Sequence, residues 1–158
     1  MAVVEQLIER YQLHPHPEGG WYREVHRSTL QVRRSDGQAR SAFTQILFLL
    51  QAPAVSRWHR VSQADETWLF IGGEPLELQC LPARGGTPTI TRLGFNLSDP
   101  GLTPLAVVPA ECWQAARCLG AWSLVSCAVG PGFSFSDFSL LADQPLSRHP
   151  SGASQELL

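Results

Sequence analysis

The segment SRWHRVSQADETWLFIGGEP, residues 56–75, decides the fold class because its pattern predicts two strands joined by a polar turn. Side chains alternate across a strand, so His59 and Val61 share one face of the first strand. Glu66 and Trp68 share one face of the second strand by the same argument. If the hairpin folds with His59 and Glu66 inward, an imidazole and a carboxylate lie on one wall beside aromatic side chains.

The rest of the chain repeats this pattern of short strands. Strand-like segments rich in β-branched and aromatic residues follow at even intervals, each bounded by Gly, Pro, Asp or Ser clusters. The pair Asp36-Gly37 is a strong hairpin turn signal, and apolar residues at helical spacing predict one short helix over residues 3–12. Many short, evenly spaced strands predict a sandwich or closed barrel rather than βαβ units. The sequence therefore predicts an all-β fold with an N-terminal helix.

A chain of 158 residues is expected to form one domain. We predict a single domain over residues 1–141, with the helix in residues 1–13 and the barrel in residues 21–141. The tail of residues 142–158 is polar and contains Pro and Gly, which leaves two alternatives, an ordered arm or a frayed end.

Composition excludes several classes of function. The chain is 44% hydrophobic and 16% charged, which argues against disorder. The net charge of −2 and the pI near 6.2 argue against nucleic acid or an acidic membrane surface as a partner. The longest apolar run is too short for a membrane span, and carboxylates within the N-terminal apolar pattern exclude a signal peptide. Four cysteines without zinc-type spacing predict buried free thiols and a cytoplasmic location.

The hairpin of residues 56–75 has the spacing of the first cupin motif: His, one residue, His, four residues, Glu, six residues, Gly. His59, Glu66 and Gly73 stand at three of the four signature positions, and Val61 stands at the second histidine position. The hairpin therefore resembles a cupin motif that lacks one histidine.

A second segment, VVPAECWQAARC at residues 107–118, resembles the second cupin motif of Pro, one residue, Gly, two residues, His. Pro109 fits, whereas Glu111 stands at the glycine position and Gln114 at the histidine position. The order and separation of the two segments, in a chain expected to form a small β-barrel, identify a cupin.

A longer resemblance covers nearly the whole chain. HPHPEGGWYREVHRS, WHRVSQADETW, GGEPLELQCL, VVPAECWQAAR and PGFSFSDFSLL together are similar to a family of small single-domain cupins, cupin 5, whose members are largely of unknown function. The resemblance implies a double-stranded β-helix, or jelly roll, and a homodimer. It also implies a small-molecule pocket similar to those of sugar-isomerase and sugar-nucleotide-epimerase cupins.

The motifs favour a pocket without metal. A first-row metal in this fold is normally held by three histidines and one glutamate, with positions left open for substrate. This chain offers His59, Glu66 and the weak neutral ligand Gln114, while Val61 offers none. Two good ligands do not usually hold a divalent ion against water. We expect no cofactor; the alternative is a divalent metal bound by His59, Glu66 and Gln114.

Eight residues are candidates for the site. We expect His59 to be the general base, with Glu66 as the acid or as the carboxylate that orients the imidazole. The six candidates for ligand binding are hydrogen-bonding, aromatic or strand-face residues: Arg57, Gln114, Trp68, Phe70, Tyr22 and Glu24. Tyr22 and Glu24 share a strand face that points either to the pocket or to a dimer partner.

Other polar residues are given structural roles. His14 and His16 are expected to be loop residues in the rigid HPHP segment, and Glu18 is not expected to contact the ligand. Asp137 is explained by pairing with an arginine or capping a turn as well as by catalysis.

Three functions remain open from the sequence alone. The first is a cytoplasmic isomerase or epimerase of a sugar or sugar-acid derivative, a reaction that needs only proton transfer next to a carbonyl. The second is a non-catalytic module that binds a small molecule, and the third is a metal-dependent oxygenase.

Overall fold

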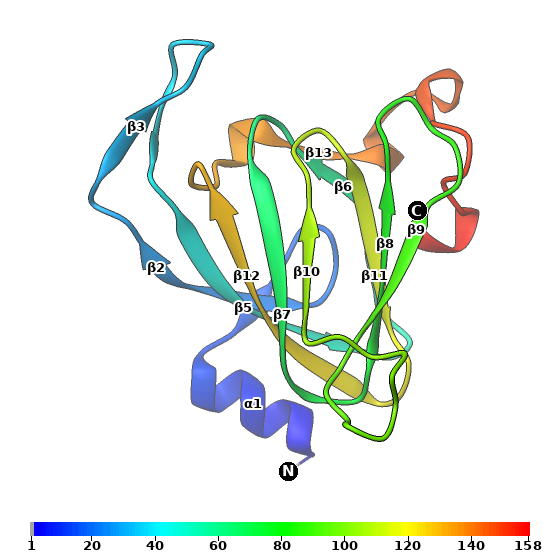
Figure 1. Cartoon of the computed structure of the whole chain (residues 1–158). Helices are drawn as coiled ribbons and strands as arrows, with labels where there is room; N and C mark the ends of the chain where they lie inside the picture. The colour runs from blue at the N-terminus through cyan, green and yellow to red at the C-terminus, as the bar shows by residue number, and fades with distance from the viewer. Residues whose placement is uncertain (1) are drawn as a thin grey trace.

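Two antiparallel sheets face each other in the computed structural model, which describes residues 2–158 (Figure 1). The strands of the first sheet are, in spatial order, β1 (His14–Pro15), β2 (Trp21–Arg27), β5 (Thr44–Gln51), β12 (Trp122–Gly130), β7 (Asp65–Gly73) and β10 (Leu105–Val108). Those of the second are β13 (Phe138–Leu140), β6 (Val55–Val61), β11 (Trp113–Cys118), β8 (Leu76–Leu81) and β9 (Thr89–Leu93). Most neighbours in each sheet are distant in the sequence, as in a jelly roll. The predicted all-β jelly-roll fold is confirmed.

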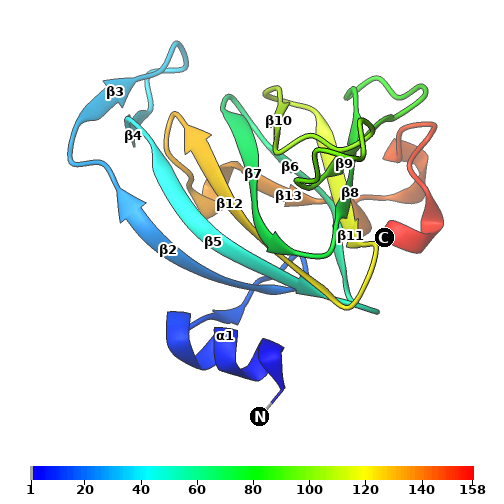
Figure 2. The ribbon, with the colours of Figure 1, turned by 60° about the horizontal axis from the view of Figure 1, so that its bottom comes forward.

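The predicted hairpin turn at Asp36-Gly37 joins two short strands outside the two main sheets. These strands are β3 (Gln31–Arg33) and β4 (Ala39–Ser41), and Gly37 has a φ of +83° in the turn between them. The hairpin, called here the β3–β4 arm, projects beyond the main sheets in both views (Figures 1 and 2).

The space between the sheets is filled by inward-facing side chains. The largest buried members of this core include Phe48, Leu50, Trp68 and Leu76, each with 1% or less of its surface exposed. Alternation along each strand sends every second side chain inward, so both sheets contribute to one core.

The N-terminal helix, α1 (Val3–Tyr11), confirms the predicted element and packs against the first sheet. Val4 on its apolar face is buried in a cluster with Leu13, Leu49 of β5 and Leu124 of β12. Figure 2 shows α1 lying below these strands, away from the β3–β4 arm. In the described part of the chain, no helix has the length and apolar character needed to cross a membrane.

The C-terminal tail is an ordered arm packed on the second sheet. It contains three short 3₁₀ helices, η2 (Leu141–Asp143), η3 (Leu146–Arg148) and η4 (Gln155–Leu157). The Trp58 indole, which points to the opposite face of β6 from His59, donates to the Ser154 carbonyl oxygen at 3.1 Å. Of the two alternatives left by the sequence, the structure shows the ordered arm, placed away from the cavity described below.

Leu157 is the main apolar anchor of this tail, with 2% of its surface exposed beside Trp58 and Trp113. We expect Leu157→Ala to lower the free energy of unfolding by about 2–3 kcal/mol, because it leaves a cavity against these rings. Urea denaturation followed by tryptophan fluorescence measures the change. Leu146→Ala is the matched control, since Leu146 in the same tail is 77% exposed and its truncation should cost less than about 0.5 kcal/mol. Equal costs for the two variants would contradict the packing described.

The four cysteines are free, as predicted. Only Cys127 is buried, however, and Cys80, Cys112 and Cys118 are half-buried, so the expectation of burial is met at one position.

Candidate functional site

One end of the barrel contains a cavity of about 960 Å³. Its closed end is formed by the buried side chains of Glu18, His59 and Glu66, which we call the floor. Its open end is lined by more exposed residues of the β3–β4 arm and of the segment around η1 (Phe135–Asp137). A concave site with a few polar groups at its base is the usual form of a small-molecule pocket.

Half of the eight predicted site residues line this cavity, namely His59, Glu66, Tyr22 and Glu24. The other four, Arg57, Trp68, Phe70 and Gln114, are not among the lining residues in the chain as described. Each of these four instead supports the site from outside the cavity or belongs to the core. Phe70, for example, packs against the core between the sheets.

His59 is fixed by both of its ring nitrogens. Its Nδ1 lies 2.7 Å from the Arg57 carbonyl oxygen, which can only accept, so Nδ1 carries a hydrogen. Its Nε2 lies 3.1 Å from Glu18 Oε2, and only 2% of the side chain is exposed. The carboxylate at hydrogen-bonding distance of this imidazole is thus Glu18, whereas the sequence interpretation had given that position to Glu66.

Glu18 reaches the floor from the loop between β1 and β2. Gly19 and Gly20 follow it with φ values of +112° and +72°, which fold the loop back tightly. The Glu18 carbonyl oxygen accepts the Arg57 backbone N–H at 2.8 Å, and the Ser56 hydroxyl donates to Glu18 Oε1 at 2.7 Å. The loop is therefore bonded to β6, which also carries His59.

Arg57 holds the same loop with its side chain. Its Nη2 donates to the Pro17 carbonyl oxygen at 2.6 Å, so the guanidinium fixes the loop. In this structure the Arg57 guanidinium contacts the loop backbone and does not line the cavity, and its contact with a ligand stays a prediction.

Burial sets the protonation of the Glu18–His59 pair. Desolvation raises the pKa of Glu18 from 4.5 to about 8, against the opposing effects of the Ser56 hydrogen bond and the Arg57 charge. Desolvation also lowers the pKa of His59. At neutral pH, Glu18 is then mostly a carboxylic acid that donates its proton to Nε2 of a neutral His59. The pair is uncharged and holds one proton that either partner can take.

Glu66, the third floor residue, is oriented by a chain of two hydrogen bonds. The Trp68 indole donates to Gln114 Oε1 at 2.8 Å, and Gln114 Nε2 donates to Glu66 Oε2 at 2.6 Å. Desolvation raises the pKa of Glu66 to about 7, with nearby His59 lowering it and Glu18 raising it further. Trp68 and Gln114 therefore position the Glu66 carboxyl group, which titrates near neutral pH.

Aromatic side chains cover one wall above the floor. Phe138 of β13 stacks on the His59 ring with centroids 5.6 Å apart, and Phe133 and Phe135 pack edge to face with each other at 4.9 Å. Stacked and edge-to-face pairs of this kind stabilise a fixed ring arrangement. The cavity consequently combines a polar floor with an apolar wall.

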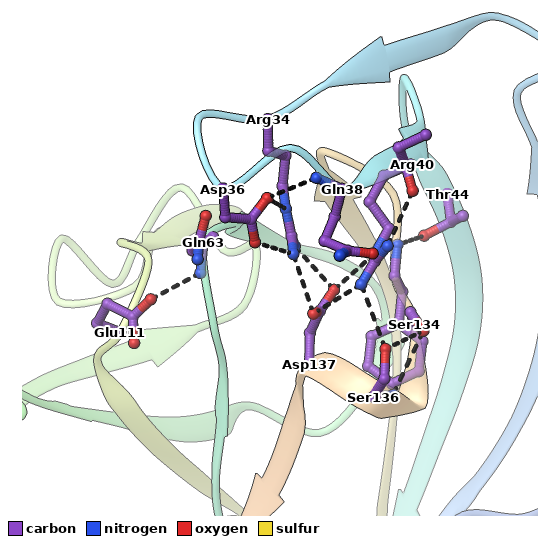
Figure 3. A network of polar contacts seen from close by, with 12 residues as sticks. Arg34, Asp36, Gln38, Arg40, Thr44, Gln63, Glu111, Ser134, Ser136 and Asp137 are labelled. Atoms are coloured by element: carbon purple, nitrogen blue, oxygen red, sulfur yellow. Dashed lines mark hydrogen bonds and ion pairs between the residues drawn. The ribbon is translucent and has the colours of Figure 1, made fainter.

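At the open end of the cavity, an ion-pair network joins the β3–β4 arm to η1, two segments that are distant in the sequence. Asp137 of η1 accepts from Arg34 Nη1 at 2.9 Å and from Arg40 Nε at 2.8 Å, and it lies between the two guanidinium groups (Figure 3). Arg34 also pairs with Asp36 at 2.7 Å. These contacts lower the pKa of Asp137, although burial alone would raise it. Pairing with arginines, one of the alternatives left open for Asp137, is the arrangement found.

The floor does not fit the metal site that a cupin usually carries. Gln114 presents its amide nitrogen to Glu66, and its oxygen accepts from Trp68. Val61 lines the cavity without a donor atom. Across residues 2–158, no cluster of three or more His, Cys, Asp or Glu side chains is placed to hold a metal ion.

Two floor-side residues were missed in the sequence interpretation, Glu18 and His16. His16 lines the cavity, and only 5% of its side chain is exposed. Both lie in the loop HPHPEGG, where strand alternation gives no information about direction. The available signal was the glycine pair itself, because a loop with such backbone angles can turn a carboxylate back into the barrel.

The sequence of residues 5–141 matches the family Cupin_5, described as cupin superfamily (DUF985). A hypothetical protein from Leishmania major is 33% identical, with a TM-score of 0.78 and 85% of each chain covered. A protein from Shewanella oneidensis is 35% identical, with a TM-score of 0.79 over 89% of this chain and 85% of that one. Cellulomonas parahominis L-ribose isomerase, solved with L-psicose, shares the fold at 12% identity and a TM-score of 0.57, over 80% of this chain and 70% of that one. None of the curated proteins matches the chain.

Proposed function

We propose, starting from the fact that the chain belongs to the DUF985 family of the cupin superfamily, that it binds a sugar or sugar-acid derivative in the barrel cavity and isomerises or epimerises it. The observation that carries this proposal is the floor, where two carboxyl groups with raised pKa values flank a neutral imidazole. An acid and a base that titrate near the working pH are what proton transfer requires.

In the proposed reaction, Glu66 in its ionised form removes a proton from the carbon next to a carbonyl group. In isomerisation, Glu18 donates its acidic proton to the former carbonyl carbon, and the hydroxyl proton on the carbon that was deprotonated moves to the former carbonyl oxygen. In epimerisation, Glu18 donates its proton to the opposite face of the carbon that lost one. Glu66 then releases a proton and Glu18 takes one up, which restores their starting forms. His59 can accept the proton of Glu18 through Nε2 and return it, so it acts as a second proton carrier next to the Glu18 carboxyl group. The number of protons is conserved, and we propose that no metal or other cofactor takes part.

The size and lining of the cavity support a small polar ligand with an apolar side. About 960 Å³ falls at the upper end of the volume usual for small-molecule pockets. The name of the L-ribose isomerase neighbour agrees with a sugar as ligand, although similarity at 12% identity supports only a shared fold.

A second function, non-catalytic binding, is favoured by one observation. Both ring nitrogens of His59 are already engaged, and Glu66 is bonded to Gln114, so the polar groups of the floor are satisfied without a substrate. A satisfied network is also what a rigid binding site contains.

Exchange with D₂O separates the two functions. We expect a sugar that raises the melting temperature, from a panel including L-ribose, D-glucuronate, sugar phosphates and sugar nucleotides, to exchange one carbon-bound proton for deuterium in the presence of the protein. Proton NMR follows the loss of that signal. Glu66→Gln should slow the exchange by at least about 100-fold, because it removes the base.

Glu74→Gln is the control, since Glu74 is exposed and does not line the cavity. Its exchange rate should equal that of the wild type. Binding without exchange would support the non-catalytic module, and a panel in which nothing binds would contradict both functions.

The cytoplasmic location and the homodimer stay predictions.

A further inference from the structure

His16 occupies a fixed position on the cavity wall, beside the floor. Its ring packs edge to face against Tyr22 at 4.5 Å and against Phe138 at 5.9 Å between centroids, and Phe48 and Phe135 lie at 6.1 Å. Only 5% of the side chain is exposed. Contacts with four rings leave this imidazole little freedom to rotate.

A backbone hydrogen bond determines which nitrogen of His16 carries the hydrogen. The Glu18 backbone N–H donates to Nδ1 of His16 at 3.2 Å, so Nδ1 uses its lone pair and the ring hydrogen resides on Nε2. Burial, together with the nearby His59 and His14, lowers the pKa of His16 to about 3. The ring is therefore neutral at physiological pH and presents an N–H group.

This N–H group has no hydrogen-bond partner among residues 2–158. His16 Nε2 is not one of the fully buried polar atoms that lack a partner, so its N–H faces the open space of the cavity, where it is available to an acceptor. His16 lies on the wall of the cavity, where a bound molecule can accept from it. Glu18 and Glu66 supply the proton-transfer groups at the floor beside this donor.

We infer that the Nε2–H group of His16 binds an oxygen of the ligand, and that this oxygen is the carbonyl oxygen at the reacting carbon of an α-hydroxy aldehyde or ketone. This inference rests on the proposed function and adds the class of substrate and the residue that polarises it. As Glu66 removes the proton next to the carbonyl, negative charge develops on the carbonyl oxygen, and a fixed donor stabilises it there.

A neutral imidazole suits this role better than an imidazolium does. It donates a hydrogen bond to the developing enolate and keeps its own proton, so the intermediate is not trapped by full protonation. The role differs from that of His59, whose ring nitrogens face Arg57 and Glu18.

The experiment combines NMR of ¹⁵N-histidine-labelled protein with binding to four probes. L-ribose and D-glucuronate present a carbonyl group in their open forms, and their reduced counterparts ribitol and L-gulonate do not. We expect the wild type to show the Nε2–H tautomer at His16, and we expect its Nε2 signal to shift with a carbonyl-bearing probe and not with the reduced partner.

Two variants provide the matched comparison. His16→Phe keeps the ring packing and removes the donor, so affinity for the carbonyl-bearing probe should fall by about tenfold, the effect of one lost hydrogen bond. His16→Gln restores an amide N–H near the Nε2 position and should bind within about threefold of the wild type.

The outcomes distinguish this inference from the proposed function. If no probe binds the wild type, the proposed function fails and the inference fails with it. If a probe binds the wild type and His16→Phe equally well, only the role of His16 is overturned. A hydrogen on Nδ1 of His16 in the wild type would also overturn it, even if both variants fail to fold.

Discussion

Glu18→Gln is expected to be more stable than the wild type at pH 9 and to have nearly the same stability at pH 5. In the folded protein, burial raises the pKa of Glu18 to about 8, whereas in the unfolded chain it lies near 4.5. Between these values the folded state keeps a proton that the unfolded state releases, so wild-type stability falls as pH rises through this range. The full difference above pH 8 is on the order of 5 kcal/mol.

Glutamine keeps the hydrogen bonds of the protonated acid without its titration. Its oxygen can accept from Ser56, and its amide can donate to Nε2 of His59. The variant therefore loses the destabilisation that the wild type acquires at high pH. Glu66, with a pKa raised to about 7, is unchanged and leaves a smaller decline of the same sign.

Urea unfolding at pH 5, 7 and 9 measures this difference. Exposed Glu9 gives the control, because Glu9→Gln should follow the wild type at all three values. Below pH 6.5 both proteins should lose stability, since burial lowers the pKa of His16 and the unfolded chain takes up a proton that the folded state does not. Parallel curves for Glu18→Gln and the wild type from pH 5 to 9 would show that Glu18 is ionised in the folded protein.

Gly19→Ala is expected to lower the free energy of unfolding by at least about 3 kcal/mol and to displace Glu18 from the floor. Gly19 has a φ of +112°, and a Cβ atom there would collide with the carbonyl oxygen of Val55. Because the Val55 carbonyl group belongs to the backbone, no side-chain rotation relieves the collision. The loop must move, and the hydrogen bonds of Glu18 to Ser56 and His59 are lost with it.

Gly37→Ala separates this collision from the cost of a left-handed backbone. Gly37 has a φ of +83°, and a Cβ atom there would meet nothing within 4 Å. Its cost should be about 1 kcal/mol, close to the penalty of the backbone conformation alone. Chemical denaturation of both variants gives the comparison, and a cost for Gly19→Ala no larger than that for Gly37→Ala would contradict the tight packing of the loop on β6.

The sequence predicted those parts of the site that strand alternation controls. His59 and Val61 on β6 and Glu66 on β7 were expected to point inward, and all three line the cavity. The period of two is enforced by burial, because a strand shifted by one residue would place its apolar side chains in water. Residues 56–75 therefore form two strands with the predicted inward faces, but β6 and β7 belong to opposite sheets and do not pair with each other, so the prediction of a hairpin was wrong.

Alternation alone could not rank the inward residues by depth. Trp68 and Gln114 point into the barrel, as expected for their strands, yet both are buried beside Glu66 and do not line the cavity. Whether an inward side chain reaches the ligand or supports another residue depends on how far the two sheets are separated at that level. A single sequence contains no direct measure of that separation.

Loop residues were the other source of error. Glu18 and His16 were expected to be structural, and the structure places both on the cavity. Their directions depend on the φ angles of Gly19 and Gly20 and on the bonds that Arg57 makes to the loop. These are contacts between segments about 40 positions apart, which local patterns do not encode.

The cavity has two parts with separate origins in the chain, and the ion pairs of Asp137 join the segments that line the open end. The floor is built from strands of the barrel and the loop that is bonded to them, whereas the open end is built from the β3–β4 arm and η1, joined by Arg34 and Arg40. Substitutions in the arm can thus alter which molecules enter while the proton-transfer groups keep their places. Relatives with the same floor and different arms would be free to diverge in ligand preference without losing a shared chemistry.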